Sequence, residues 1–326
     1  MEQYTLSIIV PMYNAEKYIG TCLDSILNSN LPKDDFEIVI VNDGSKDNSV
    51  DIAKDYASKY SNISYYTQEN QGQSTARNVG IKSSKGKYVW CVDSDDKVNA
   101  DVKGIVETLK THPSLDIIAF KLHKITESGA EVGIECEQPA VPHGQIMRGR
   151  DAIFQGYDPS SVCALAIRKG FMADHDLFFH VGMTHQDVEL SYRLFAVAGD
   201  VLFTNLVPYV YILHPNSTSQ SINPKKKIKY VSDDCIVIES FADLASHFKD
   251  KDKDLYDVIM HRIKNIHFGM ALNIMRHRSE WEPSGICKGV IDNMRQHNLF
   301  PLKGDFGSWK KNLVAKLMNV ILGRYI

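Results

Sequence analysis

The sequence KYVWCVDSDD, residues 87–96, decides the fold, because an apolar run typical of a buried strand ends abruptly in three carboxylates. In an open α/β sheet, ligands bind beyond the carboxyl ends of the strands, so this acidic cluster is well placed to hold a divalent cation. Mg²⁺ typically takes one or two protein carboxylates and fills its other positions with water and phosphate oxygens, which predicts a phosphorylated ligand. The alternative is a solvated turn in which an Asp caps the next helix.

Short strands and helices alternate from residue 6 to about residue 121, which is typical of a parallel sheet covered by helices. We expect strands at residues 6–10, closed by Pro11, and at residues 36–41, 63–66 and 88–92, with a helix after each of the first three. Parallel strands would bring the polar loops that follow the first, second and fourth strands to one edge of the sheet. These loops are Tyr13-Asn14, Asn42-Asp43-Gly44-Ser45 and Asp93-Ser94-Asp95-Asp96.

Composition excludes several protein classes. The 326 residues are 44% hydrophobic and 24% charged, as in ordinary globular proteins. The six cysteines are widely spaced without a Cys-x-x-Cys pair, so neither a zinc site nor a disulfide framework is indicated. The chain lacks both Gly-x-Gly-x-x-Gly and the Gly-Lys-Ser/Thr phosphate loop, which argues against a dehydrogenase and a P-loop ATPase. Without a signal peptide or a long apolar span, we expect a cytoplasmic protein.

Four motifs in the first third of the chain resemble, in order, those of the family 2 glycosyltransferases, which are inverting enzymes of the GT-A fold. The motifs are residues 10–14 (VPMYN), 41–49 (VNDGSKDNS), 70–80 (NQGQSTARNVG) and 93–96 (DSDD). The resemblance implies an α/β, GT-A-like fold, with a Rossmann-related, mostly parallel central sheet flanked by helices. It also implies that the N-terminal part binds a nucleotide-diphosphate sugar.

The resemblance implies that Asp43 contacts the base, that Arg77 lies near the nucleotide and that Asp95 binds a divalent metal, Mn²⁺ or Mg²⁺. Uracil presents its N3–H as a donor and cytosine does not, so a carboxylate at Asp43 favours a uridine or thymidine donor. Without the resemblance, Asp43-Gly44 is equally a plain turn, and Arg77 a solvated helix residue. The other expected nucleotide-sugar contacts are Pro11, Tyr13, Asn14, Gly44, Asp93 and Ser94.

Inversion requires a base that deprotonates the acceptor hydroxyl. Residues 183–194 resemble the family's Glu-Asp motif at the start of a helix, and they offer Asp187 as this base. Gln186 stands where a Glu is usual, which alters the charge around Asp187. Two alternatives remain open: Asp187 could simply be a first-turn acid that favours the helix dipole, and His185 could be a rival base.

Residues 209–219 resemble the segment that in this family closes over the diphosphate, and His214 is the expected second metal ligand or phosphate contact. An ordinary loop histidine is the alternative. We expect a GT-A catalytic domain at residues 1–222, in which residues 1–100 bind the nucleotide-sugar and residues 110–220 form the acceptor side. A helical period then predicts a helical C-terminal region at residues 223–326.

The C-terminal region differs in charge from the rest of the chain. Residues 240–326 contain 14 Lys and Arg against 9 Asp and Glu, whereas the remainder contains 23 against 31. The lysine run at residues 225–227 has no interleaved aromatic residue, so no nucleic-acid partner is expected.

Residues 307–326 combine cations with an apolar stripe that suits a membrane surface, or equally the protein's own core or a second subunit in a homo-oligomer. The stripe is Leu313, Val314, Leu317, Met318, Ile321 and Leu322, with Trp309 and Tyr325 nearby.

These features predict a metal-dependent, inverting glycosyltransferase that moves a sugar from a UDP-sugar to a glycan or lipid-linked acceptor in bacterial cell-surface polysaccharide synthesis. We expect it in the cytoplasm or on the inner face of the cell membrane. One alternative is a non-catalytic nucleotide-sugar-binding or scaffolding protein of the same fold, which would not need Asp187. The other is a sugar nucleotidyltransferase, which would need a Gly-rich loop with Arg or Lys to hold a triphosphate.

Overall fold

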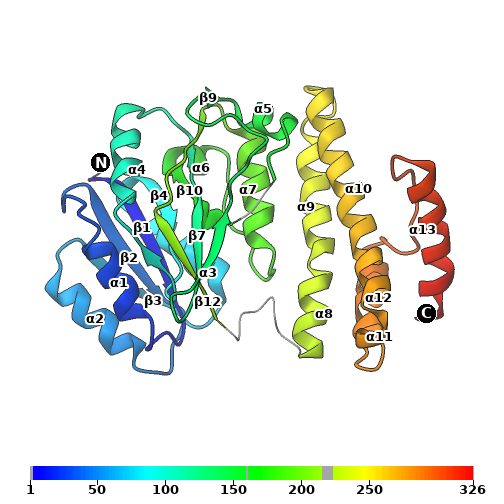
Figure 1. Cartoon of the computed structure of the whole chain (residues 1–326), viewed down its shortest axis with the longest axis horizontal. Coiled ribbons are helices and arrows are strands. Elements are labelled where there is room, and N and C mark those ends of the chain that lie inside the picture. The colour runs from blue at the N-terminus through cyan, green and yellow to red at the C-terminus, as the bar shows by residue number, and fades with distance from the viewer. Residues whose placement is uncertain (1–2, 159–160, 215–222, 326) are drawn as a thin grey trace. The chain divides into compact units, whose positions relative to one another are not determined.

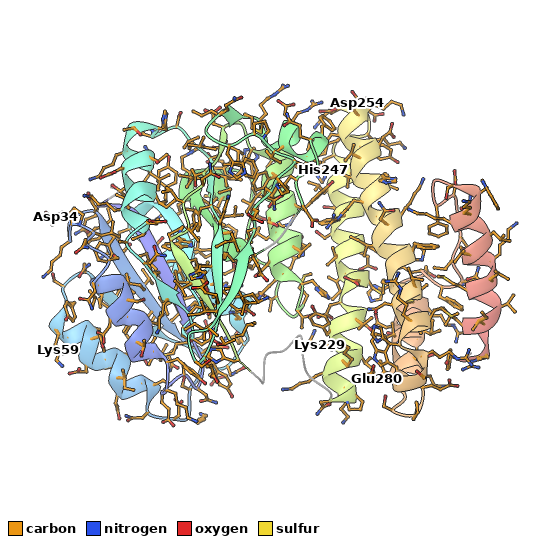
Figure 2. All side chains as sticks on the ribbon, viewed as in Figure 1. Asp34, Lys59, Lys229, His247, Asp254 and Glu280 are labelled. Atoms are coloured by element: carbon orange, nitrogen blue, oxygen red, sulfur yellow. The ribbon has the colours of Figure 1, made fainter. Side chains whose placement is uncertain are left out.

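The computed structural model describes residues 3–158, 161–214 and 223–325 (Figure 1). The chain divides into two compact units. The N-terminal unit consists of Met1–Gly182 and Gln186–His214, and the C-terminal unit of Met183–His185 and Pro215–Ile326. Charged side chains such as those of Asp34 and Lys59 project from the outer loops and helices of the N-terminal unit (Figure 2).

Within the described residues, the main sheet of the N-terminal unit has eight strands in the order β3-β2-β1-β4-β10-β6-β11-β9. The strands β3, β2, β1 and β4 run parallel, β10 is antiparallel to both of its neighbours, and β6 and β11 are parallel to each other. The expected α/β architecture with a mostly parallel central sheet is thus confirmed. Its strands are β1 (Tyr4–Met12), β2 (Phe36–Asn42), β3 (Ile63–Thr67), β4 (Gly86–Cys91), β6 (Ile117–Ala119), β9 (Ile146–Met147), β10 (Leu165–Arg168) and β11 (Val201–Phe203).

The first strand is longer than expected, because β1 continues through Pro11 to Met12. The last pairing of β1 with β4 is Ile9 with Cys91, whereas its pairing with β2 extends to Met12 and Asn42. The carbonyl of Met12 accepts a hydrogen bond on the β2 side, so the nitrogen of Pro11 faces the side where β4 has ended. No ladder hydrogen bond is lost there, and proline is tolerated.

Helices of the N-terminal unit cover the sheet: α3 packs on β1 and β2, α4 on β1, and α6 on β4 and β10. The contact of α3 is close because residue 80 is glycine. A Cβ at Gly80 would lie 2.3 Å from Cγ2 of Ile9. The helices are α1 (Ile19–Leu27), α2 (Ser49–Lys59), α3 (Gln73–Ser83), α4 (Val102–Thr111), α5 (Gly149–Phe154), α6 (Lys169–Asp174) and α7 (Gln186–Val197), with a 3₁₀ turn, η1 (Val162–Ala164).

A second sheet in the same unit has the order β5-β12-β7-β8 and borders the site described below. Its strands are β5 (Lys97–Val98), β7 (Leu122–Thr126), β8 (Glu131–Glu135) and β12 (Tyr209–Leu213). The two central strands, β12 and β7, are parallel, and their register ends at Leu213 opposite Thr126.

The C-terminal unit is helical, as the sequence predicts. Its first helix begins where a cap is expected, because the Asn223 side chain accepts from the backbone N–H groups of Lys225 and Lys226, with Pro224 in the first turn. None of the described helices has both the length and the apolar character needed to cross a bilayer. The helices are α8 (Pro224–Ser232), α9 (Asp234–Ser246), α10 (Lys253–Arg276), α11 (Arg278–Trp281), α12 (Ile286–Gln296) and α13 (Trp309–Leu322), followed by η3 (Gly323–Tyr325).

Candidate functional site

The loops after β1 and β2 are joined at the carboxyl edge of the parallel strands. The Asn14 side-chain oxygen accepts from the Lys46 backbone N–H at 2.8 Å, and the Asn14 N–H donates to the Ser45 hydroxyl at 3.0 Å. Gly44 in this loop has a φ of +77°, and a Cβ there would lie 2.9 Å from the backbone nitrogen of Asn70. Glycine is therefore required at this turn, whereas the ring of Tyr13 remains exposed beside it.

Asp43 is buried and already holds the loop that leads into α3. Its Oδ1 accepts from Gln68 Nε2 at 2.7 Å and from the Gln71 N–H at 2.8 Å, and its Oδ2 accepts from the Gly72 N–H at 2.9 Å. A carboxylate has about four acceptor positions, so roughly one remains for a ligand. The uracil contact of Asp43 stays a prediction, and the structural role of this side chain is now evident.

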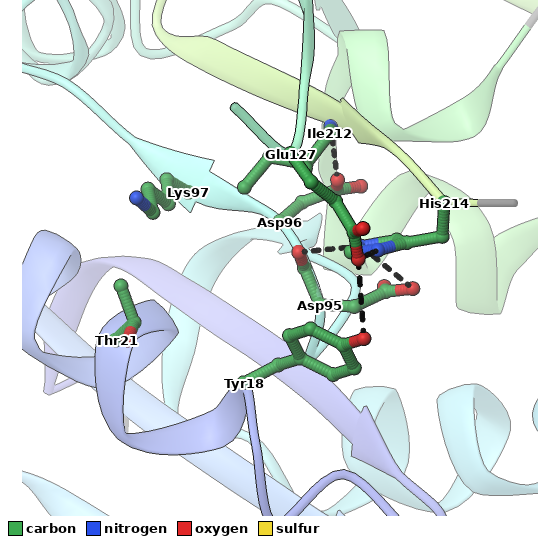
Figure 3. A pocket seen from close by; sticks show the side chains of 8 residues that line it. All are labelled: Tyr18, Thr21, Asp95, Asp96, Lys97, Glu127, Ile212 and His214. Atoms are coloured by element: carbon green, nitrogen blue, oxygen red, sulfur yellow. Dashed lines mark hydrogen bonds and ion pairs between the residues drawn. The ribbon is translucent and has the colours of Figure 1, made fainter. Parts of the chain in front are cut away.

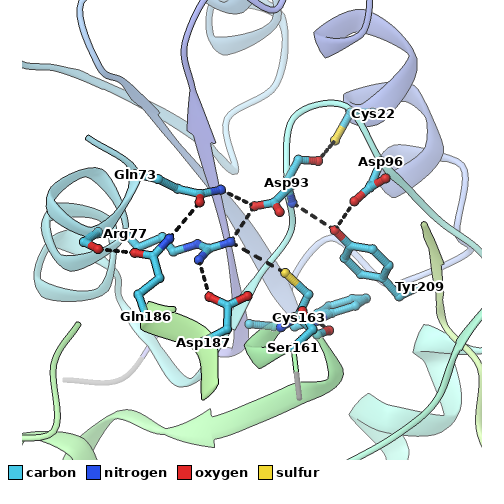
Figure 4. A network of polar contacts seen from close by, with 12 residues as sticks. Cys22, Gln73, Arg77, Asp93, Asp96, Ser161, Cys163, Gln186, Asp187 and Tyr209 are labelled. Carbon is cyan, nitrogen blue, oxygen red and sulfur yellow. Dashed lines mark hydrogen bonds and ion pairs between the residues drawn. The ribbon is translucent and has the colours of Figure 1, made fainter. Parts of the chain in front are cut away.

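Arg77 on α3 is a buried bridge between two carboxylates (Figure 4). Its Nη2 donates to Asp93 Oδ1 at 2.7 Å, and its Nη1 donates to Asp187 Oδ1 at 2.8 Å. Burial opposes the charged guanidinium, but Asp93 and Asp187 raise the pKa of Arg77 well above its ordinary value. The alternative of a solvated helix residue is wrong, because the side chain is only 1% exposed. Arg77 connects the acidic end of β4 to the start of α7.

The glutamine at position 186 uses both ends of its amide. Its Oε1 accepts from the Ser74 hydroxyl, and its Nε2 donates to Gln73 Oε1 at 2.8 Å. Gln73 in turn donates to Asp93 Oδ1 at 2.9 Å. A glutamate at position 186 would have no N–H to donate to Gln73. The glutamine found here, in place of the usual Glu, is therefore needed for this series of amide hydrogen bonds.

Asp187 lies in the first turn of α7 and is 29% exposed, so one edge of its carboxylate is accessible. Burial raises the pKa of Asp187, while the neighbouring Arg77 opposes that shift. A carboxylate with a raised pKa is a better proton acceptor, which suits a general base. The rival candidate, His185, belongs to the C-terminal unit, where its Nε2 lies 2.7 Å from the carbonyl oxygen of Tyr230.

Asp95 and His214 lie side by side in the lining of a cavity of about 190 Å³ (Figure 3). Their nearest side-chain atoms, Asp95 Oδ2 and His214 Nε2, are 3.7 Å apart. The other ring nitrogen, His214 Nδ1, lies 2.6 Å from Glu127 Oε1, and the Tyr18 hydroxyl donates to the same oxygen at 3.3 Å. The ring orientation is thus fixed by Glu127, with Nε2 directed toward Asp95.

Sequence reasoning missed Glu127, although the second sheet explains its position. β7 and β12 run parallel, and their last paired residues are Thr126 and Leu213. The next residue on each strand is Glu127 or His214, so these two side chains meet where the strands end together. Only the pairing of two strands about 90 residues apart reveals this, and a single sequence gives no signal for such pairing.

The carboxylates after β4 have three different roles. Asp93 pairs with Arg77, and Asp95 faces His214, with the half-buried Ser94 between them. Asp96 is buried and accepts from the Tyr209 hydroxyl at 2.5 Å and from the Ile212 N–H at 2.7 Å. Burial, reinforced by Asp93 and Asp95, raises the pKa of Asp96 to about 8. Asp96 therefore attaches the acidic loop to β12 and leaves Asp95 as the accessible carboxylate of the cavity.

Comparison with known proteins gives a consistent result. Residues 7–166 match the family model described as Glycosyl transferase family 2. The uncharacterized glycosyltransferase YibD of Escherichia coli is 31% identical over 219 residues, which cover 66% of this chain and 63% of YibD. The poly(ribitol-phosphate) beta-N-acetylglucosaminyltransferase TarS of Staphylococcus aureus is 31% identical over 175 residues, which cover 53% of this chain and 29% of TarS. The chain therefore spans less than two thirds of the length of these relatives.

The fold has solved counterparts. The crystal structure of S. aureus TarS 1–349 in complex with UDP-GlcNAc superposes with a TM-score of 0.69 at 20% sequence identity. The superposition covers 98% of this chain and 89% of that one. The shared architecture is the GT-A fold with its helical C-terminal region.

Proposed function

We propose that this chain, whose residues 7–166 form a family 2 glycosyl transferase domain, transfers a sugar from a UDP-sugar to a glycan or lipid-linked acceptor with inversion at the anomeric carbon. One observation carries the proposal: Arg77 holds Asp187, the expected base, beside Asp93, two residues from the expected metal ligand Asp95. The expected base and the acidic loop after β4 come from distant parts of the chain and share one polar network, which supports the proposal.

The residues at the cavity fit a divalent metal. Asp95 offers a carboxylate oxygen and His214 an imidazole nitrogen, a mixed set that suits Mn²⁺. Among the described residues no group of three or more His, Cys, Asp or Glu side chains could hold a metal. Two protein ligands are enough if phosphate oxygens of the donor and water complete the shell. When bound, the metal would supply Lewis-acid stabilisation of the departing diphosphate.

Glu127 supports this role of His214. Metal-ligating histidines usually donate their second ring N–H to a carboxylate, which fixes the tautomer and makes the free nitrogen more basic. Glu127 lies at Nδ1, so a neutral ring would carry its lone pair at Nε2, which is 3.7 Å from Asp95 Oδ2 and 3.4 Å from the Asp95 carbonyl oxygen. Tyr18 holds the same Glu127 oxygen and packs its ring 4.6 Å from the His214 ring.

Asp187 carries the chemistry on the acceptor side. Its carboxylate takes the proton of the acceptor hydroxyl while that oxygen attacks the anomeric carbon from the face opposite the leaving UDP. The bond between the anomeric carbon and the diphosphate oxygen breaks, and its electron pair leaves with UDP. Arg77 keeps the Asp187 carboxylate oriented through Oδ1 and compensates the negative charge of Asp93 next to it.

A paired experiment tests the proposal. UDP-sugars are screened for transfer or hydrolysis with Mn²⁺, before and after chelation, and UDP binding is measured by calorimetry. Asp95→Ala should lose metal-dependent turnover and bind UDP more weakly, while Asp187→Asn should bind UDP normally and lose transfer. A protein that binds UDP-sugars but never turns them over, with or without metal, would instead be a nucleotide-sugar-binding scaffold. Full transfer activity in Asp187→Asn would remove Asp187 from the base role.

A further inference from the structure

The helix α13 of the C-terminal unit has apolar residues on two opposite sides. Figure 1 shows the helix near the C-terminus. One side is buried in the unit through Ala315, Met318 and Leu322, and the helix packs on α10. The other side is open, with Trp309 71% and Val320 78% exposed. Leu313 and Leu317 are also about half exposed on this side. The apolar stripe expected from the sequence is therefore divided between the two sides, and the protein's own core accounts for only one of them.

The open residues form one continuous band. At about 100° per residue, Trp309, Val320, Leu313 and Leu317 fall within an arc of roughly 80° along the helix axis. Lys316 and Lys310 lie about 20° beyond the two edges of this arc. We call this surface, made of these four apolar residues and two lysines, the outer band of α13. Cations thus border the band on both sides.

Charge on α13 has a single sign. The helix sequence WKKNLVAKLMNVIL contains three lysines and no aspartate or glutamate. The third lysine, Lys311, is directed toward α10, where its Nζ donates to Asn265 Oδ1 at 3.1 Å. Lys310 lies over the ring of Trp309 at 5.8 Å and remains exposed. The outer band is therefore apolar in the middle and positive at its edges.

We propose that the outer band of α13 docks on an anionic lipid surface. A helix that lies in the headgroup layer inserts its apolar side and keeps lysines at the edges, where they meet lipid phosphates. Indole rings such as that of Trp309 are favoured at this depth. A second copy of the chain fits less well, because a two-fold contact through this band would place the lysines of one copy close to those of the other. Docking is independent of sugar transfer and would bring the proposed transferase to lipid-linked acceptors.

Vesicle binding by the full chain tests this proposal. Cosedimentation is measured with phosphatidylcholine vesicles, with and without phosphatidylglycerol, at low and high salt. Each lysine near an anionic surface contributes roughly fivefold in affinity, so Lys310→Gln with Lys316→Gln should weaken binding about 25-fold. Leu313→Gln with Leu317→Gln should weaken it at least tenfold. Both pairs replace surface residues, and circular dichroism establishes that each variant is folded.

A matched control removes the same charge elsewhere. Lys249→Gln with Lys251→Gln alters two exposed lysines between α9 and α10 and should leave vesicle binding within about twofold. High salt should weaken binding of the wild type to anionic vesicles, and vesicles without phosphatidylglycerol should bind it weakly. Equal binding by the α13 variants and the wild type would overturn the proposal. So would sedimentation of the wild type as a dimer that the leucine variant disrupts, without vesicle binding, since a second copy would then cover the band.

Discussion

Replacing Glu127 by glutamine tests whether this side chain orients His214 as the proposed metal ligand. The substitution keeps the size of the side chain and removes its charge. Glu127 is the hydrogen-bond partner of His214 Nδ1 at 2.6 Å, and this bond lowers the pKa of Glu127. With glutamine the amide can rotate and offer either its oxygen or its N–H to Nδ1, so the tautomer with a lone pair at Nε2 is no longer enforced.

The contact between Glu127 and His214 sets the expected loss of metal affinity. Loss of a carboxylate that supports a metal-ligating histidine typically weakens metal binding roughly 10- to 100-fold. Because Glu127 is about half exposed, we expect a value near the lower end of this range. Fold stability should change little for the same reason. Tyr18→Phe, which removes the hydrogen bond at 3.3 Å to the same oxygen, should have a smaller effect in the same direction.

Calorimetric titration of Mn²⁺ into the protein with UDP present measures this directly, without reliance on turnover. Glu131→Gln is a matched control, since Glu131 lies on the neighbouring strand β8 and pairs with His123, a histidine that does not line the cavity. Equal Mn²⁺ affinity in Glu127→Gln and the wild type would refute the orienting role. Equal loss in both variants would show that the effect comes from net charge and not from the contact with His214.

Other expectations follow from the same geometry. Asp187→Asn should reduce transfer by at least 100-fold, with UDP affinity within about threefold of the wild type, as measured by a transfer assay beside calorimetry. Asp43→Ala should weaken UDP binding roughly ten- to a hundredfold, for a lost charge-assisted hydrogen bond of about 1.5–3 kcal/mol, and unchanged affinity would contradict the base contact. Burial lowers the pKa of His267, against the opposing hydrogen bond to the Leu299 carbonyl. The unfolded chain then takes up a proton first, so stability should fall as the pH drops through about 6.5, and His267→Gln should flatten this dependence in urea denaturation between about pH 7.5 and 5.

The order of strands, loops and helices in the first third could be predicted from the sequence, because each element carries its own periodic pattern and turn residues. The sequence could not predict which residues pair with the carboxylates of the acidic loop after β4. In the sequence, Asp93, Asp95 and Asp96 cannot be told apart. Their roles differ because each contacts a different residue from a distant part of the chain, namely Arg77, His214 or Tyr209. Glu127 was missed for a related reason, since strand register and not local pattern places it beside His214.

The C-terminal helix α13 shows a different limit of prediction from the sequence. Helical periodicity identifies apolar residues on α13, but it does not say which of them the protein itself covers. The structure buries Met318 and leaves Leu317 exposed one residue away. The packing of α13 within the C-terminal unit, including its contact with α10, separates these two neighbours.

The bridge made by Arg77 limits how segments of this fold could be exchanged between relatives. A segment exchange that takes α7 from a relative would bring it against the resident α3, and the Arg77 guanidinium would meet whatever residue the relative supplies at position 187. Without a carboxylate there, a buried cation would keep Asp93 as its one ion-pair partner described here, and the amide chain through Gln186 and Gln73 would have to re-form as well. An exchange of segments between relatives therefore has to move residues 73, 77, 186 and 187 together, because they form one polar network that links α3 to α7.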